Sequence, residues 1–245
     1  MLNANGIEFR NEQGIFPLIV FEKTQQSFRC IGTTFFINGL GIFVTAKHVF
    51  SGELQDDRMI FVLQCLSDKT AVSRIVTTLC LHPFADIAVG QVGVALDPMT
   101  AQPVNCEIAP NCRLALKKIE TGTKIMGFGY PKTAKTTQAN LTTFNFLGTW
   151  STGVVEDFHP LGFSNLKNKC YQTNMRIESG CSGGPVFKEG LVVGINSSSF
   201  EMTHEENPIS FITPMDYLLD LQLSFDEGLL TVQEIIKRCG IIVGD

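Results

Sequence analysis

Short apolar runs, each broken by turn residues, repeat along most of this chain. Four examples are FPLIVFE (16–22), RMIFVLQCL (58–66), GLVVGINSS (190–198) and ISFIT (209–213). Runs of this length that are rich in Val, Ile, Phe and Thr and end at Gly, Pro, Asn or Asp are typical of β-strands. Little helical periodicity separates them, and 245 residues suit one large all-β domain or two small lobes. The sequence therefore predicts an all-β sandwich or barrel fold.

The connections between the runs carry their own signals. Asn38-Gly39 stands between two apolar runs and predicts the turn of a hairpin. The segment 95–111 contains several prolines, one of them directly after Asp97, and indicates a crossover between two lobes.

The pattern changes near the C-terminus, where two helices are predicted. The first is expected over 215–223, because a proline precedes a run with helical spacing. The second is expected after Thr231, which forms a capping box with Glu234, and Gly240 is expected to end it.

Composition indicates a globular protein and excludes several classes. Apolar residues make up 44% of the chain and charged residues 18%. No apolar stretch approaches the roughly 18–20 residues that span a membrane, and the first residues lack the features of a secretory signal. We therefore expect a cytoplasmic protein with no membrane partner. The eight cysteines include no C-x-x-C pair, so we expect reduced thiols and no metal site.

The formal charge of −5 is unevenly distributed. Residues 1–112 carry seven Lys/Arg and ten Asp/Glu, residues 113–176 carry nine and three, and residues 177–245 carry three and eleven. The basic middle contains no nucleic-acid motif. We interpret both charged regions as solvated surface and expect no nucleic-acid partner.

Three short stretches contain residue types that could act in catalysis. They are VTAKHVF (44–50), HPFADIAVG (82–90) and ESGCSGGPVF (178–187), and they supply a His, an Asp and a Ser in that order. A serine hydroxyl is a poor nucleophile at neutral pH and needs a base within hydrogen-bond reach. Each stretch alone could be structural: a Gly-rich turn, a histidine at a strand end, or an aspartate that caps a turn. Their combination favours catalysis.

Together, the three stretches resemble the chymotrypsin-like (trypsin-like) serine peptidases, in particular the bacterial HtrA/Deg branch. In that family the His follows a Thr-Ala step, as His48 does, and the Asp opens a D-I-A-V strand, as Asp86 does. The nucleophile lies in G-x-S-G-G, as Ser182 does. GTTFFI (32–37) and SFITP (210–214) resemble further strands of the family. The resemblance covers most of the chain.

The resemblance implies a fold of two antiparallel β-barrels with C-terminal helices. We expect three segments: an N-terminal barrel with His48 and Asp86 (1–105), a C-terminal barrel with Ser182 (106–215) and a C-terminal helical segment (216–245).

The resemblance also implies a role for each site residue. His48 would accept the proton of Ser182 and return it to the leaving amine, and Asp86 would hold the imidazole in the right tautomer. The backbone N–H groups of Gly180 and Ser182 would form the oxyanion hole. No metal and no organic cofactor is implied.

Cys181, directly before Ser182, raises two questions. Zymogen-activated members of the family have an aspartate here, which pairs with a newly cut N-terminus. A thiol cannot make that ion pair, so we expect an active-site loop that is preformed or ordered by a partner. A cysteine protease that uses Cys181 as the nucleophile stays a third interpretation.

Substrate-binding residues follow from the resemblance as well. The backbone of Ser197, Ser198 and Ser199 would pair with an extended peptide. A specificity pocket is expected near Arg176, Ser179 and Ile209. Relatives that cut after basic residues carry an aspartate six residues before the serine, where this chain has Arg176. We expect a preference for small or medium apolar residues, or for an acidic one if Arg176 faces the pocket.

The main interpretation is a serine endopeptidase that acts on a protein or peptide substrate, and an activating partner is left open. The alternative is a catalytically silent peptide-binding module on the same scaffold. Because only about 30 residues follow SFITP, we expect no PDZ domain and a narrow target.

Overall fold

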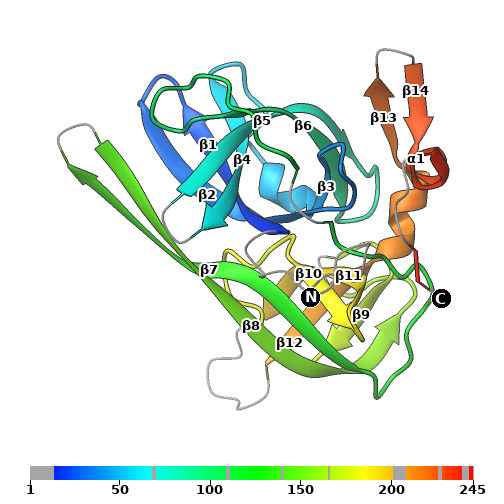
Figure 1. Ribbon diagram of the computed structural model, residues 1–245. Helices are drawn as coiled ribbons and strands as arrows, with labels where there is room; N and C mark the ends of the chain where they lie inside the picture. The colour runs from blue at the N-terminus through cyan, green and yellow to red at the C-terminus, as the bar shows by residue number, and fades with distance from the viewer. Residues whose placement is uncertain are drawn as a thin grey trace.

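A computed structural model of the chain describes residues 14–67, 70–108, 111–138, 141–164, 166–200, 208–225, 228–238 and 243–244. They form two closed β-barrels, one above the other in Figure 1, with a small C-terminal group of elements beside the first barrel. The prediction of an all-β fold with two antiparallel barrels is confirmed. Among the described residues, no helix is both long enough and apolar enough to cross a lipid bilayer.

The first barrel closes because β1 pairs with both β2 and β4. Phe16, Phe35 and Phe43 are fully buried, and each such side chain contributes about 1.5–3 kcal/mol on burial. The strands, which pair in the order β1-β2-β3-β6-β5-β4, are β1 (Ile15–Glu22), β2 (Ser27–Phe36), β3 (Ile42–Thr45), β4 (Arg58–Ser67), β5 (Thr70–Leu81) and β6 (Ala88–Leu96).

The turn between β2 and β3 differs from the predicted two-residue turn at Asn38-Gly39. The Asn38 side-chain oxygen accepts hydrogen bonds from the N–H groups of Leu40 (3.1 Å) and Ile42 (3.0 Å). The residue in the left-handed region is Gly41, with φ +77°. The hairpin therefore exists, but the Asn38 side chain organises a longer loop.

The second barrel also closes, in the order β10-β11-β12-β9-β8-β7. Apolar side chains of both barrels share one core, and the Tyr130 hydroxyl donates a hydrogen bond to the Ile15 carbonyl (2.7 Å) between them. The strands are β7 (Lys124–Gln138), β8 (Leu141–His159), β9 (Cys170–Thr173), β10 (Pro185–Lys188), β11 (Leu191–Phe200) and β12 (Ile209–Pro214).

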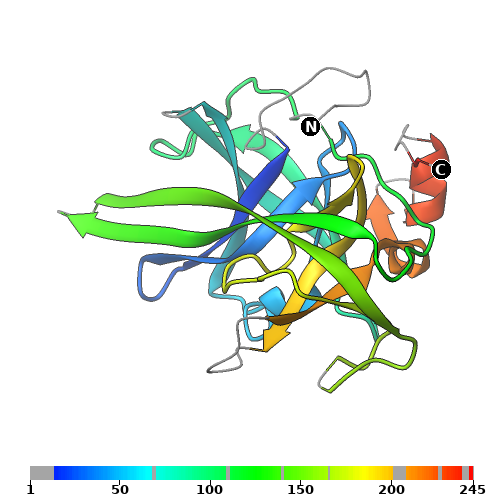
Figure 2. The same ribbon diagram turned by 90° about the horizontal axis from the view of Figure 1, so that it is seen from below.

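β7 and β8 are the longest strands of the structure, with 15 and 19 residues. Their outer parts leave the second barrel as a two-stranded ribbon, residues 132–138 of β7 and 141–147 of β8, which we call the arm. Figure 1 shows the arm as the long green hairpin, and Figure 2 shows it projecting away from both barrels.

The C-terminal segment contains less helix than predicted. The expected helix over 215–223 is a short 3-10 helix, η3 (Met215–Asp220), followed by the strand β13 (Gln222–Phe225). Leu221 and Leu223 are both buried, and burial of alternate side chains suits a strand. β13 pairs with β14 (Gly228–Thr231).

The second predicted helix is α1 (Val232–Arg238), and its capping box is present. Thr231 N–H donates to the Glu234 carboxylate (2.8 Å), and Glu234 N–H donates to the Thr231 hydroxyl (3.1 Å). Gly240, the expected end of this helix, lies outside the described residues.

Candidate active site

Two neighbouring strands of the first barrel bring His48 and Asp86 together. β3 and β6 are antiparallel, and Thr45 pairs with Ala88. His48 lies three residues after Thr45, in the 3-10 helix η2 (Lys47–Phe50), and Asp86 lies two residues before Ala88. Because the end of one antiparallel strand meets the beginning of its neighbour, both side chains stand at the same rim of the barrel.

The Asp86 carboxylate holds the His48 ring from one side. His48 Nδ1 lies 2.9 Å from Asp86 Oδ2 and 3.0 Å from Oδ1, and the His48 backbone N–H donates to Oδ1 (2.9 Å). An ionised carboxylate can only accept hydrogen bonds, so Nδ1 carries a proton and Nε2 of the neutral ring is left as an acceptor. The Asp86 side chain is 12% exposed and the His48 side chain 44%, so the ring stands open to a ligand while the carboxylate is shielded.

The loop that carries Ser182 lies between β9 and β10 and presses against the first barrel. A Cβ atom on Gly183 would lie 2.0 Å from the Thr45 hydroxyl oxygen, so only glycine fits there. Gly183 also has φ +81°, a conformation that favours glycine. Because Thr45 precedes His48 by three residues, this contact puts the Ser182 loop beside the His48 rim.

The amide groups of this loop fall into two sets. The N–H groups of Cys181, Gly183 and Gly184 donate to backbone carbonyls at 2.8–3.0 Å. Those of Gly180 and Ser182 donate to no acceptor among the described residues, and both residues are partly exposed. Gly180 has φ +93° in a turn closed by the bond from Cys181 N–H to the Glu178 carbonyl. Two N–H groups without acceptors, one of them the serine's own, are what an oxyanion hole needs.

Thr33, in β2, connects this loop to both barrels, and the sequence analysis did not identify it. Its hydroxyl donates to the Gly180 carbonyl (2.8 Å) and accepts from Tyr130 N–H (3.1 Å). Its own N–H donates to the Ser182 carbonyl (2.8 Å). Threonine is common in strands, so its presence in GTTFFI gave no signal of this role.

Two further residues hold the Asp86 loop and were also missed. Lys47 Nζ donates to the carbonyls of His82 (2.8 Å) and Pro83 (3.1 Å). The Asn168 side-chain oxygen, from the second barrel, accepts from Asp86 N–H (3.1 Å). All three bonds depend on tertiary contacts between distant parts of the chain.

The structure brings the three predicted residues to one region, and one expected bond is not made. Among the described residues, the Ser182 hydroxyl has no hydrogen-bond partner, so it does not bond His48 here. Such bonds are often long without substrate and shorten when it binds.

Cys181 points away from this region. Its side chain is buried in the second barrel, and a Cβ atom on Gly129 would lie 2.8 Å from its sulfur. Burial raises the pKa of the Cys181 thiol to about 11. A buried, protonated thiol is a poor nucleophile, which disfavours the cysteine-protease interpretation.

The expected substrate-binding residues differ in their exposure. β10 pairs with β11 as far as Ile195, and the backbone of Asn196 still bonds Gly183 and Gly184, so only beyond Asn196 does the described β11 backbone have β12 as its one strand partner. The Ser197 side chain is buried and hydrogen-bonds the Thr213 hydroxyl (2.7 Å), whereas Ser198 and Ser199 are partly exposed. Ile209 is partly exposed, and the two other residues expected at the pocket, Arg176 and Ser179, are exposed.

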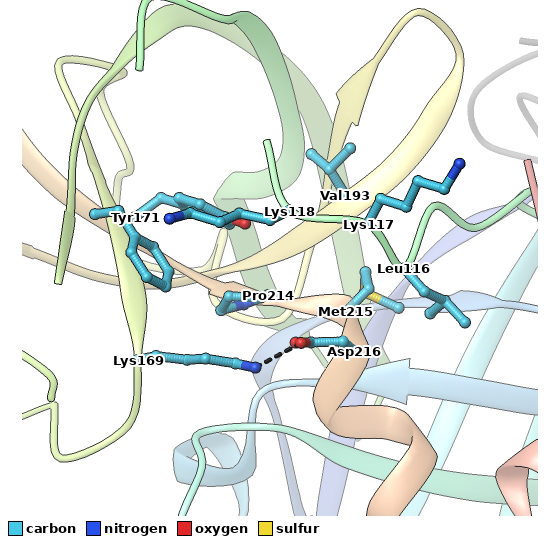
Figure 3. Close-up of a pocket in the computed structure, with 10 residues that line it drawn as sticks. Leu116, Lys117, Lys118, Lys169, Tyr171, Val193, Pro214, Met215 and Asp216 are labelled. Carbon is cyan, nitrogen blue, oxygen red and sulfur yellow. Dashed lines mark hydrogen bonds and ion pairs between the residues drawn. The ribbon is translucent and has the colours of Figure 1, made fainter. Parts of the chain in front are cut away.

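A cavity of about 220 Å³ lies elsewhere, where the segment before β7 meets the second barrel and η3 (Figure 3). None of the predicted site residues lines it. Lys118 Nζ sits 3.9 Å from the centre of the Phe158 ring, and Lys169 is paired with Asp216, as the dashed line in Figure 3 shows. Two of its three lysines are thus already engaged.

Most of the chain is similar to a known family of peptidase domains. A family model described as a trypsin-like peptidase domain matches residues 32–195, about two thirds of the chain. No curated protein sequence matches significantly.

Several solved structures have a similar fold at low sequence identity. Deg5 is 18% identical over 94% of this chain and 91% of its own, with a TM-score of 0.58. The HtrA-type protease AlgW with a tripeptide is 20% identical over 95% of this chain and 62% of its own, with a TM-score of 0.60. The Rv3671c protease from M. tuberculosis in its active form is 17% identical over 96% of this chain and 85% of its own, with a TM-score of 0.56. At these identities the likeness concerns the fold.

Proposed function

The chain belongs to the trypsin-like peptidase domain family, and from that premise we propose that it is a serine endopeptidase with Ser182 as its nucleophile. The observation that carries the proposal is the pair of free amides beside Ser182, next to a His48 ring oriented by Asp86. Because Gly180 and Ser182 are both partly exposed, these two N–H groups are open to a substrate oxygen, whereas the other N–H groups of the loop, those of Cys181, Gly183 and Gly184, are paired within the protein.

In the proposed reaction, Ser182 Oγ attacks the carbonyl carbon of the substrate and its proton passes to His48 Nε2. The carbonyl oxygen becomes an oxyanion, which accepts hydrogen bonds from the N–H groups of Gly180 and Ser182. His48 then gives the proton to the amine nitrogen, the C–N bond breaks, and the acyl group stays on Ser182. Water, deprotonated by His48, attacks the acyl-enzyme, and the acid product leaves as Ser182 regains its proton. Asp86 stabilises the imidazolium in both steps.

We propose that the substrate binds as an extended strand along the open part of β11. The backbone of Ser198 and Ser199 pairs with β12 on one side only, and Ser197 lies at an irregularity of that pairing, so this stretch can offer hydrogen-bonding groups to a peptide on the other side. No acidic residue stands at the position of Arg176, where relatives that cut after Lys or Arg carry one. A small or medium apolar residue before the cleaved bond fits this better than a basic one.

A silent peptide-binding module, the alternative, would use the same open strand and would not need the free amides. The two functions differ in whether a bond is cut.

Digestion of a defined peptide library, read by mass spectrometry, tests the proposal. Wild-type protein should cut after small or medium apolar residues, and Ser182→Ala should lower the rate by at least about a thousandfold. Ser224→Ala, at an exposed serine of β13, is the control and should cut normally. Cleavage that survives in Ser182→Ala would disprove Ser182 as the nucleophile, and dominant cleavage after Lys or Arg would disprove the expected specificity.

A further inference from the structure

The arm (132–147) lacks strand partners within the described residues. Residues 132–138 of β7 pair only with residues 141–147 of β8. β10 reaches β7 only at Met126 and Gly127, and β9 reaches β8 only from Val155 onward. Both outer edges of the ribbon thus present backbone N–H and C=O groups, and such an edge is a template for a further strand.

The arm is basic and carries no acidic residue. No Asp or Glu occurs between Glu120 and Glu156, a stretch that contains three lysines. Two of them, Lys132 and Lys135, are exposed on the arm, and neither has an ion-pair partner among the described residues. The arm thus has the charge that complements an acidic segment.

Each face of the arm combines a lysine with an apolar side chain. On one face, Lys135 lies opposite Phe144, whose ring stacks on Phe146 at 5.4 Å between centroids. On the other face, Lys132 lies opposite Leu147, which is 53% exposed. An added strand that alternates acidic and apolar side chains could therefore contact both kinds of group.

The root of the arm touches the loop with the proposed oxyanion hole. A Cβ atom on Gly180 would lie 2.6 Å from the Tyr130 carbonyl oxygen and 3.2 Å from Pro131 Cα. Thr33 bonds both Tyr130 N–H and the Gly180 carbonyl. A chain that lies along the arm thus runs toward the place where a substrate would be cut.

We propose that the arm is a docking strip that binds an extended acidic segment of the protein substrate, at a distance from the cleaved bond. This inference rests on the proposed peptidase function for the identity of the partner. The contact with Gly180 favours a substrate over a second copy of the chain, since a self-interface has no need to adjoin the nucleophile. The contacts with the arm, two exposed ion pairs and one added strand, are each weak. The docking strip therefore adds affinity to a substrate that also binds at β11.

Direct binding tests the strip without requiring catalysis. The probe is a fluorescein-labelled peptide of twelve residues that alternates Glu and Val, titrated with the Ser182→Ala protein by fluorescence anisotropy. The double variant Lys132→Glu/Lys135→Glu should bind it about tenfold more weakly, since it removes two exposed ion pairs and puts like charges in their place. The neutral variant Lys132→Gln/Lys135→Gln should give an intermediate loss of affinity. It controls for the possibility that the glutamates weaken binding by disturbing the structure of the arm.

The matched control is Lys117→Glu/Lys237→Glu, which makes the same charge change at exposed lysines outside the arm. It should bind the probe within about twofold of the parent. Absence of binding, equal binding by the arm variant, or an equal loss in the control would overturn the proposal. A dimer of the parent protein, detected by light scattering, that dissociates in the arm variant would also overturn the proposal.

Cleavage then distinguishes this inference from the proposed function. With Ser182 intact, Lys132→Glu/Lys135→Glu should lower kcat/KM for casein, an acidic unfolded protein, about tenfold. It should leave kcat/KM for a hexapeptide from the library within about twofold. If the wild type cuts neither, the peptidase proposal fails, while the binding measurement still decides whether the arm is a docking strip.

Discussion

The Thr33 hydroxyl donates a hydrogen bond to the Gly180 carbonyl across 2.8 Å and 147 residues of sequence. This bond ties a central strand of the first barrel to the oxyanion loop of the second. Since Thr33 also binds Tyr130 N–H and the Ser182 carbonyl, one buried side chain and its backbone fix three points around the proposed nucleophile. The geometry of the loop therefore depends on the packing of the two barrels.

Thr33→Val tests this connection. Valine has nearly the same shape but removes the hydroxyl's bonds to the Gly180 carbonyl and from Tyr130 N–H, which should cost about 1–3 kcal/mol of unfolding free energy. It should also lower kcat about tenfold or more, with a smaller change in KM. Thr34→Val is the control, because the Thr34 hydroxyl is equally buried but bonds Val44 inside the first barrel. A similar kcat in both variants would show that Thr33 is only structural.

Gly183→Ala should strongly destabilise the protein. The new Cβ atom would overlap the Thr45 hydroxyl at 2.0 Å, and φ is +81°. Gly190→Ala has almost the same φ, +80°, but meets nothing within 4 Å. Urea unfolding should therefore give a loss of about 1 kcal/mol for Gly190→Ala from backbone strain and at least about 3 kcal/mol for Gly183→Ala. Equal losses would mean that the loop is not pressed against Thr45.

Cys181 should be unreactive in the folded protein. With a pKa of about 11, roughly one thiol in a thousand is ionised at pH 8, and burial blocks access. Peptide mapping after iodoacetamide should find Cys181 unmodified in native protein and modified after unfolding. Cys181→Ala should keep its peptidase activity. Rapid alkylation of native Cys181 with loss of activity would revive the cysteine-protease interpretation.

His82 should make the stability of the protein dependent on pH. Its side chain is buried, and Nδ1 accepts from the N–H groups of Phe84 (3.2 Å) and Ala85 (2.8 Å), just before Asp86. Burial lowers the pKa of His82, and the nearby Asp220 only partly opposes this. The unfolded chain then binds more protons below about pH 6.5, so stability is full above that pH and falls as pH decreases.

His82→Asn provides the comparison, because an asparagine oxygen can accept the same two bonds without titrating. Unfolding free energies measured from pH 8 to pH 5 should fall more steeply for the wild type than for this variant. Parallel curves would show that His82 titrates alike in both states.

The sequence pointed to the candidate site residues but not to the residues that support them. The stretches around His48, Asp86 and Ser182 carry the family resemblance that implied two barrels, and the structure confirms the barrels. Thr33, Lys47 and Asn168 could not be identified, because their roles exist only once distant segments pack. A threonine, a lysine or an asparagine has many ordinary uses in a chain.

Local patterns also misled where tertiary packing decided the structure. The leucines over 218–223 fit a helix by spacing, yet Leu223 is the buried residue of the strand β13, between the exposed Gln222 and Ser224. The arm was not predicted as one long ribbon, because its β7 part, KTAKTTQ (132–138), has no apolar alternation to mark a strand.

Labelling with a fluorophosphonate probe, followed by peptide mapping, tests the central claim most directly. The account predicts one adduct, on Ser182, that is lost in Ser182→Ala, strongly slowed in His48→Ala and kept in Cys181→Ala. An adduct on another residue, or none in protein shown to be folded, would contradict the claim that Ser182 is an activated nucleophile.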